Sequence, residues 1–198
     1  LLFFKKEIIA FGKNQKLFFR IIFASIPLFL FGYLIVKYNL VSDLSTYKVI
    51  GWSTIIFGIL LYFADKCDLG QKIQDNFTTK NAFIIGFFQV LALIPGVSRS
   101  GIVITAGRFL RFDRYDSTKI SFYLSIPVIA GASFLGFKDL YKESAEFNSM
   151  IIFTVFFSYF FSYFTIKYFL IFVKKFDLKL FVIYRILLSI LLFGIIYF

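Results

Sequence analysis

The sequence predicts an all-α, polytopic membrane helix bundle, and three observations support that prediction. Of the 198 residues, 60% are hydrophobic and 32 are Phe, whereas soluble domains are roughly 45–50% apolar. The apolar residues form windows near the length that crosses a bilayer. The 22 Lys and Arg and 11 Asp and Glu cluster between these windows, as in loops that join membrane spans. Nucleic-acid binding needs a solvated basic face, so we expect no nucleic-acid partner despite the net charge of +11.

Five apolar windows predict the spanning helices. A span needs about 20 mostly apolar residues, and charged residues such as Arg20, Lys37 and Asp65 mark the ends of the first two windows. The opening "LLFF" runs directly into "KKE", as a membrane helix meets its basic flank, so we expect further chain before Leu1. We predict one transmembrane domain over residues 1–198, with spans at about 21–36, 49–63, 120–137, 150–173 and 180–198.

Residues 81–107 carry one charge, Arg99, and fit either one long span or a re-entrant hairpin of two short helices. Pro95 removes a helix hydrogen-bond donor, and Gly96 and Gly101 permit an open backbone. Local chemistry therefore favours the hairpin, whose arms of about 11 to 14 residues are too short to cross a bilayer.

The distribution of Lys and Arg also favours the hairpin. With a hairpin, two loops on one side carry 2 basic residues each, and the four regions on the other side carry 5, 3, 4 and 3. The richer side is cytoplasmic by the positive-inside rule. A single span would invert the later loops and reverse this order. The richer regions are 1–20, 64–80, 108–119 and 174–179, and the poorer ones are 37–48 and 138–149.

The other charged and reactive residues have ordinary interpretations. Arg111 and Lys119 fit a loop that contacts anionic lipid headgroups. Arg185 and Lys167 lie near the ends of their windows, where long side chains snorkel to the interface. Cys67 is the one cysteine and the sequence has no histidine, so an intrachain disulfide is excluded and acid–base catalysis would need other groups.

The segment "PGVSRSG", residues 95–101, is the main candidate for chemistry. Irregular backbone at membrane depth is either buried in protein or lines a wet cavity, and an ionisable residue there indicates a functional site. Arg99 suits phosphate or carboxylate, and Ser98 or Ser100 can cap the helix that follows. The N-terminus of that helix adds unpaired N–H groups and a positive dipole. We predict a phosphate-binding site; the alternative is that Arg99 pairs with a buried carboxylate, although no apolar window contains an acid.

This segment also carries a family resemblance. With its flanks "AFIIGFFQVLALI" and "RFLRFDRYDSTKISFYLSIPVIAGA", "PGVSRSG" resembles the second signature region of the undecaprenyl-diphosphatase (bacitracin-resistance) family. The closing "YRILLSILLF" is similar to the last helix of that family. The resemblance implies an inverted-repeat fold with two re-entrant hairpins, of which this chain would hold the C-terminal part. It also implies a multi-pass enzyme of the bacterial cytoplasmic (inner) membrane, with its site facing the periplasm.

The resemblance assigns an activity and residues. The family hydrolyses undecaprenyl diphosphate to undecaprenyl phosphate and phosphate, which recycles the carrier lipid for peptidoglycan synthesis. Ser98 and Arg99 match the motif residues that bind and polarise the diphosphate, and we expect both to be catalytic. The position that usually holds a threonine is Val103 here. The expected phosphate-binding set is Gly96, Ser98, Arg99, Ser100 and Gly101, with weaker candidates at Thr105 and at Arg114, which matches a supporting arginine.

The family's first signature, a Glu-rich segment followed by a hairpin that contains a histidine, has no counterpart in the 198 residues. By resemblance it would supply the ligands of a divalent cation, Mg or Ca, and the proposed serine nucleophile. We therefore expect no metal ligand in this chain, the signature before Leu1, and no activity from these 198 residues alone. The partners expected are undecaprenyl diphosphate and membrane lipid, and a homodimer stays open. The alternative function is a transporter or flippase for a phosphorylated lipid or another anion.

Overall fold

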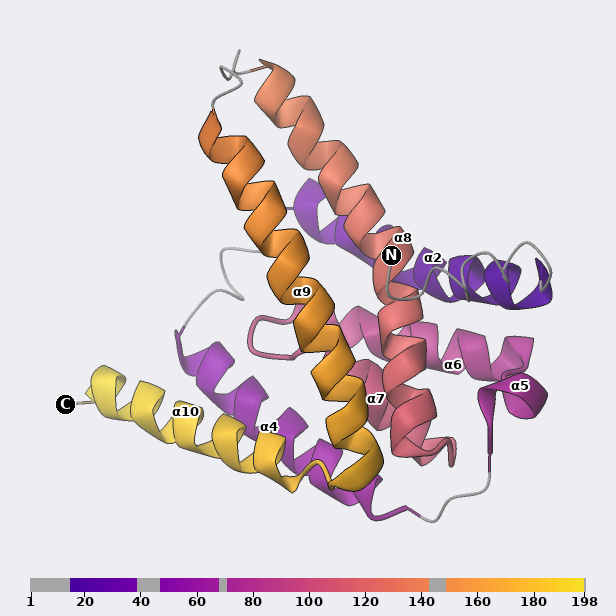
Figure 1. The fold of residues 1–198 in the computed structure, drawn as a ribbon. Helices are drawn as coiled ribbons and strands as arrows, with labels where there is room; N and C mark the ends of the chain where they lie inside the picture. The colour runs from indigo at the N-terminus through magenta and orange to yellow at the C-terminus, as the bar shows by residue number, and fades with distance from the viewer. Residues whose placement is uncertain (1–14, 39–46, 68–70, 143–148, 198) are drawn as a thin grey trace.

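The computed structural model describes residues 15–38, 47–67, 71–142 and 149–197. These residues form helices and one isolated β-bridge, between Gln71 and Phe112. Figure 1 shows the arrangement. The helices are α2 (Gln15–Lys37), α4 (Tyr47–Asp65), α5 (Ile73–Asn76), α6 (Thr79–Val90), the 3-10 turn η1 (Leu91–Leu93), α7 (Arg99–Phe109), α8 (Arg114–Lys142), α9 (Ser149–Lys175) and α10 (Lys179–Tyr197).

Five of the described helices, α2, α4, α8, α9 and α10, are long and apolar enough to cross a membrane. Each holds one of the five predicted windows, apart from residue 198, which lies outside the described residues. The predicted all-α, polytopic helix bundle is therefore confirmed. Pro27 and Pro127 lie inside α2 and α8, and membrane helices tolerate such residues where neighbouring groups satisfy the freed backbone.

The short helix α7 lies at the centre of the bundle. It packs against α8, α4 and α6, while α2 lies beside α6 and α4 lies beside α10 (Figure 1). The largest buried apolar cluster includes Ile102, Val103 and Ala106 of α7 together with Ala82 and Ile85 of α6. Gly86 lets α6 approach the backbone of α2, because a Cβ there would collide with the carbonyl group of Ala24. Small residues permit the same close approach between membrane helices generally.

The chain reverses direction between α6 and α7, as a hairpin requires. The segments on either side of the pair are hydrogen-bonded to each other: Gln71 N donates to Arg111 O at 3.1 Å, and Ile73 N donates to Asp116 Oδ2 at 3.0 Å. One straight span over residues 81–107 would hold these segments a full helix length apart. The two arms, of 12 and 11 residues, are too short to cross a bilayer.

Candidate functional site

The tip of the hairpin is attached to α4. Pro95 has no N–H and ends the helical path of the first arm, which leaves carbonyl groups at the tip without helix partners. Ser53 Oγ donates to Pro95 O at 2.6 Å, and Thr54 Oγ1 donates to Gly96 O at 3.2 Å. Two neighbouring hydroxyls of α4 therefore hold two successive carbonyls of the tip.

Gly96 is required by this attachment. Its φ is +89°, in the region that L side chains rarely adopt. A Cβ at this position would also collide with the side chain of Ser53 and lie 2.6 Å from Ile50 O. The tip packs against α4 so closely that only glycine fits.

Of the two predicted cap candidates, Ser98 and Ser100, Ser98 is the N-cap of α7. Its Oγ accepts a hydrogen bond from Gly101 N at 3.2 Å, and its carbonyl accepts one from Ile102 N at 2.9 Å. Ser98 Oγ and Ser100 Oγ are 3.2 Å apart, within hydrogen-bond distance. The backbone N–H groups of Arg99 and Ser100 have no hydrogen-bond partner within the described residues. The start of α7 therefore combines free donors with the positive end of the helix dipole.

Arg99 lies on the side of α7 that faces α8 and α9. A cavity of about 460 Å³ there, which we name the α8–α9 cavity, is lined by the Arg99 side chain and by hydroxyl groups of both long helices. Arg99 is half-buried, and within the described part of the chain its guanidinium has no hydrogen bond or ion pair. The polar residues that share this cavity are Ser100, Ser121, Ser125, Ser162 and Thr165.

A second cavity, which we name the α4–α10 cavity, lies on the other side of the same helix start and has a volume of about 430 Å³. Its polar end is formed by Gly96, Ser98, Ser100, Gly101 and Arg185, and its walls are mostly apolar. Ser100 lines both cavities. The structure thus gathers the predicted residues at one helix end but divides them between two faces of it.

The prediction that Arg185 snorkels to the interface is wrong. Its side chain is buried, with an exposed fraction of 8%, and Arg185 Nη2 donates to Gly96 O at 2.9 Å. Gly101 allows this approach, because Arg185 Nη1 lies 3.0 Å from the place where a Cβ of residue 101 would be. The carbonyl at the hairpin tip attracts the guanidinium inward, to a partner 89 positions away in the sequence.

The two weaker candidates do not join this group. Thr105 is buried, and its Oγ1 donates to Gly101 O at 2.8 Å, within its own helix. Val103 is buried in the apolar cluster, so the position that usually holds a threonine offers no hydroxyl to either cavity. Arg114 lies beyond the end of α7 that is opposite Ser98. Because α7 has 11 residues and a helix rises about 1.5 Å per residue, the two ends of α7 are about 16 Å apart.

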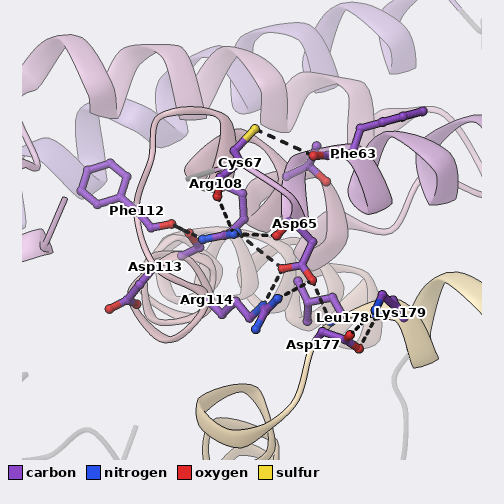
Figure 2. A network of polar contacts seen from close by, with 12 residues as sticks. Phe63, Asp65, Cys67, Arg108, Phe112, Asp113, Arg114, Asp177, Leu178 and Lys179 are labelled. Carbon is purple, nitrogen blue, oxygen red and sulfur yellow. Dashed lines mark hydrogen bonds and ion pairs between the residues drawn. The ribbon is translucent and has the colours of Figure 1, made fainter. Parts of the chain in front are cut away.

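The far end of α7 is fixed by a network around Asp65, a residue that the sequence analysis identifies only as the end of an apolar window. Figure 2 shows Arg108, Arg114 and Leu178 converging on this residue. Arg114 Nε and Nη2 donate to the two carboxylate oxygens at 2.7 and 3.0 Å, and Leu178 N donates to Oδ2 at 3.0 Å. Asp65 therefore joins the end of α4 to the start of α8 and to the loop between α9 and α10.

Arg108 completes the network through carbonyl groups. Its exposed fraction is 2%, and it donates to Asp65 O at 2.7 Å, Cys67 O at 3.0 Å and Phe112 O at 3.0 Å (Figure 2). Nearby, the hydrogen bond from the Lys179 ammonium lowers the pKa of the Asp177 carboxyl and keeps it charged. The sequence signal for this network was an acid at the end of one apolar window and a basic loop expected on the same side.

Comparison with known proteins identifies the family. Residues 2–191 match the family described as bacitracin resistance protein BacA. This chain belongs to that family. An undecaprenyl-diphosphatase of Pelagibacter ubique is 50% identical over 196 residues, which cover 98% of this chain and 77% of that protein. Undecaprenyl-diphosphatases of Saccharophagus degradans and Thermodesulfovibrio yellowstonii are each 37% identical, over 100% and 99% of this chain and 79% and 76% of their own lengths.

Proposed function

We propose that this BacA-family chain is an undecaprenyl-diphosphatase, which hydrolyses undecaprenyl diphosphate to undecaprenyl phosphate and phosphate. The observation that supports it most directly is the start of α7, where Arg99, two serine hydroxyls and N–H groups without a partner among the described residues lie at one helix N-terminus. Such an arrangement suits phosphate. The names of the relatives agree with hydrolysis and give no support to a transporter or flippase.

The contribution of these residues is charge neutralisation. As the bond between the bridging oxygen and the terminal phosphorus breaks, negative charge develops on the transferred phosphoryl group and on the leaving lipid phosphate. Arg99, Ser98 and the N–H groups of α7 are positioned to donate to those oxygens and to stabilise this charge. We assign no proton transfer to this group, because arginine stays protonated and the sequence contains no histidine.

A divalent cation, Mg or Ca, is expected from the resemblance to this family. Within the described residues no group of three or more His, Cys, Asp or Glu is arranged to hold a metal ion. The polar groups at the start of α7 are guanidinium, hydroxyl and N–H donors, which suit an anion and not a hard cation. These residues therefore suit the phosphate groups and do not fit the cation.

The described residues include five helices suited to membrane crossing, which makes this a multi-pass membrane protein. We propose the bacterial cytoplasmic membrane, with the substrate site open to the periplasm. Described residues of three predicted cytoplasmic regions, 64–80, 108–119 and 174–179, which are rich in Lys and Arg, meet at the Asp65 network. The hairpin tip at Gly96 lies at the opposite end of α7. The phosphate site at the tip then faces the opposite, periplasmic half of the bilayer.

A direct test separates hydrolysis from transport. The full-length protein in liposomes would be supplied with undecaprenyl diphosphate, and both phosphate release and movement of the lipid between leaflets would be followed. Release of one phosphate per lipid supports the proposal. Movement of intact diphosphate lipid without phosphate release would contradict it and favour the flippase alternative.

A further inference from the structure

Arg185 carries a buried charge for which the described residues provide no anion. Its exposed fraction is 8%, and its hydrogen bond runs from Nη2 to the neutral carbonyl of Gly96. Its Nε is buried without a partner, and Nη1 has none among the described residues. Burying a charge without a counter-charge is costly, so the position of Arg185 indicates an anion that the described residues do not supply.

The surroundings of Arg185 increase its need for an anion. Its Nη1 lies against Gly101, in the first turn of α7, where the helix dipole is positive. Arg99, the first residue of the same helix, adds a second positive charge, and like Arg185 it has no ion pair within the described ranges. Two guanidiniums and a helix N-terminus would repel one another unless a multivalent anion lay between or beside them.

The α4–α10 cavity has the shape and chemistry for such an anion with a lipid tail. Its volume of about 430 Å³ is typical of small-molecule sites. At the polar end, Arg185, Ser98 and Ser100 present donors around Gly96 and Gly101. Apart from Thr54 and Tyr184, the rest of the wall is apolar and suits a hydrocarbon chain. It is formed mainly by Leu61, Ile104, Leu178, Phe181 and Leu188.

We propose that Arg185 is a second phosphate-binding arginine, which contacts the diphosphate headgroup from α10 while the first part of the prenyl chain lies along the apolar wall of the α4–α10 cavity. This inference rests on the proposed function, since it takes the diphosphate lipid as the ligand. It adds a residue from the last helix to the site at the start of α7. Ser100, which lines both cavities, then lies between the two arginines.

A purely structural role would leave much of the guanidinium unused. Holding Gly96 O needs one donor, which Nη2 provides, and Ser53 and Thr54 already hold the tip from α4. A Gln side chain at position 185 also has an N–H donor for that carbonyl, but it carries no charge. The two roles therefore predict different results for the same substitution.

The experiment measures binding of inorganic pyrophosphate to the full-length protein in detergent, by isothermal titration, alongside hydrolysis of undecaprenyl diphosphate. In Arg185→Gln we expect the dissociation constant of pyrophosphate to rise roughly 10- to 100-fold, as for loss of a charge-assisted hydrogen bond. Arg185→Lys retains the charge without the fork and is expected to lie between Gln and wild type. Pyrophosphate affinity unchanged in both variants would overturn the proposal.

Ser189→Ala is the matched control. Ser189 lies one turn further along α10, is buried, and its Oγ donates to Gly51 O at 3.2 Å, so it also joins α10 to α4. It lines neither cavity, and we expect pyrophosphate affinity within about twofold of wild type. An equal loss in Ser189→Ala and Arg185→Gln would show that only helix packing was disturbed, and would also overturn the proposal.

The outcomes separate this inference from the proposed function. A wild-type protein that binds pyrophosphate through Arg185 but releases no phosphate from the lipid contradicts the function and keeps the anion site. A wild type that releases phosphate, with an Arg185→Gln variant that binds pyrophosphate normally, keeps the function and rejects the role of Arg185.

Discussion

Arg114 donates two hydrogen bonds to Asp65, from Nε at 2.7 Å and from Nη2 at 3.0 Å, across 49 positions of sequence. The guanidinium is thereby committed to a carboxylate at the opposite end of α7 from Ser98. The exposed fraction of the Arg114 side chain is 34%, against 6% for Asp65 and 2% for Arg108. Asp65 and Arg108 therefore form the buried part of this group, and Arg114 supports the site through the fold.

Replacement of Asp65 by Asn is expected to destabilise the protein. Arg108 and Arg114 would lose their shared counter-charge, and breaking a buried ion pair from one side lowers the free energy of unfolding by about 3–5 kcal/mol. Thermal unfolding of the full-length protein in detergent measures this effect. Asp177→Asn is the control, because its partner Lys179 is 58% exposed and the expected loss is below about 1 kcal/mol. Equal losses in the two variants would refute the central role of Asp65.

Replacement of Arg99 by Ala is expected to lower kcat for undecaprenyl diphosphate by about 100-fold or more, because a donor aimed at developing charge is lost. Arg99→Lys should recover only part of this, since an ammonium cannot make a two-pronged contact. Phosphate release at saturating substrate measures both variants. Near-normal kcat in Arg99→Ala would assign Arg99 a structural role only.

Replacement of Gly96 by Ala is expected to disrupt the hairpin tip. The φ of +89° and the collision with Ser53 each oppose a side chain, and a strained backbone alone costs roughly 1–3 kcal/mol. We expect a lower unfolding temperature together with reduced phosphate release. Gly194→Ala, at a position of α10 with no atom within 4 Å of a new Cβ, should be neutral or slightly stabilising. A tolerant Gly96 would mean that the tip can detach from α4 without loss.

Removal of the Thr105 hydroxyl is expected to leave substrate affinity unchanged. Thr105 Oγ1 is bonded to Gly101 O inside α7, so Thr105→Val should alter KM by less than about twofold, as expected for a site without substrate contact. Val103→Thr tests the complementary position, and its new hydroxyl would lie in the apolar cluster. A clear change of KM in either variant would mean that the buried side of α7 reaches the substrate.

The sequence predicted the helices and the hairpin because local signals determine both. Apolar windows bounded by charges mark the spans, and Pro95 with Gly96 marks the break. The organisation of the site depended on three-dimensional contacts. Ser98 is the extended N-cap and Arg99 is the first residue of the helix, so their side chains leave the chain in different directions and line different cavities although they are adjacent in the motif.

The inward position of Arg185 could not be read from its place in the last window. Distance from a helix end decides snorkelling only when nothing nearer accepts the charge, and here the acceptor is the carbonyl of Gly96. That carbonyl has no helix hydrogen bond, because Pro95 and Gly96 break the helix, and it can therefore accept from Arg185. The Asp65 network could not be read from the sequence either, because it depends on which loops meet at one end of the bundle.

The anchoring of Pro95 and Gly96 by Ser53, Thr54 and Arg185 has a consequence for ligand entry. Neither arm can shift at the tip without breaking hydrogen bonds to α4 or α10. The backbone N–H donors at the start of α7 are thus held in place before any ligand arrives. The entropy cost of ordering them is met during folding and not in each binding event. The flexible lipid must adapt its conformation to a rigid receptor, which would favour recognition of the headgroup over recognition of chain length.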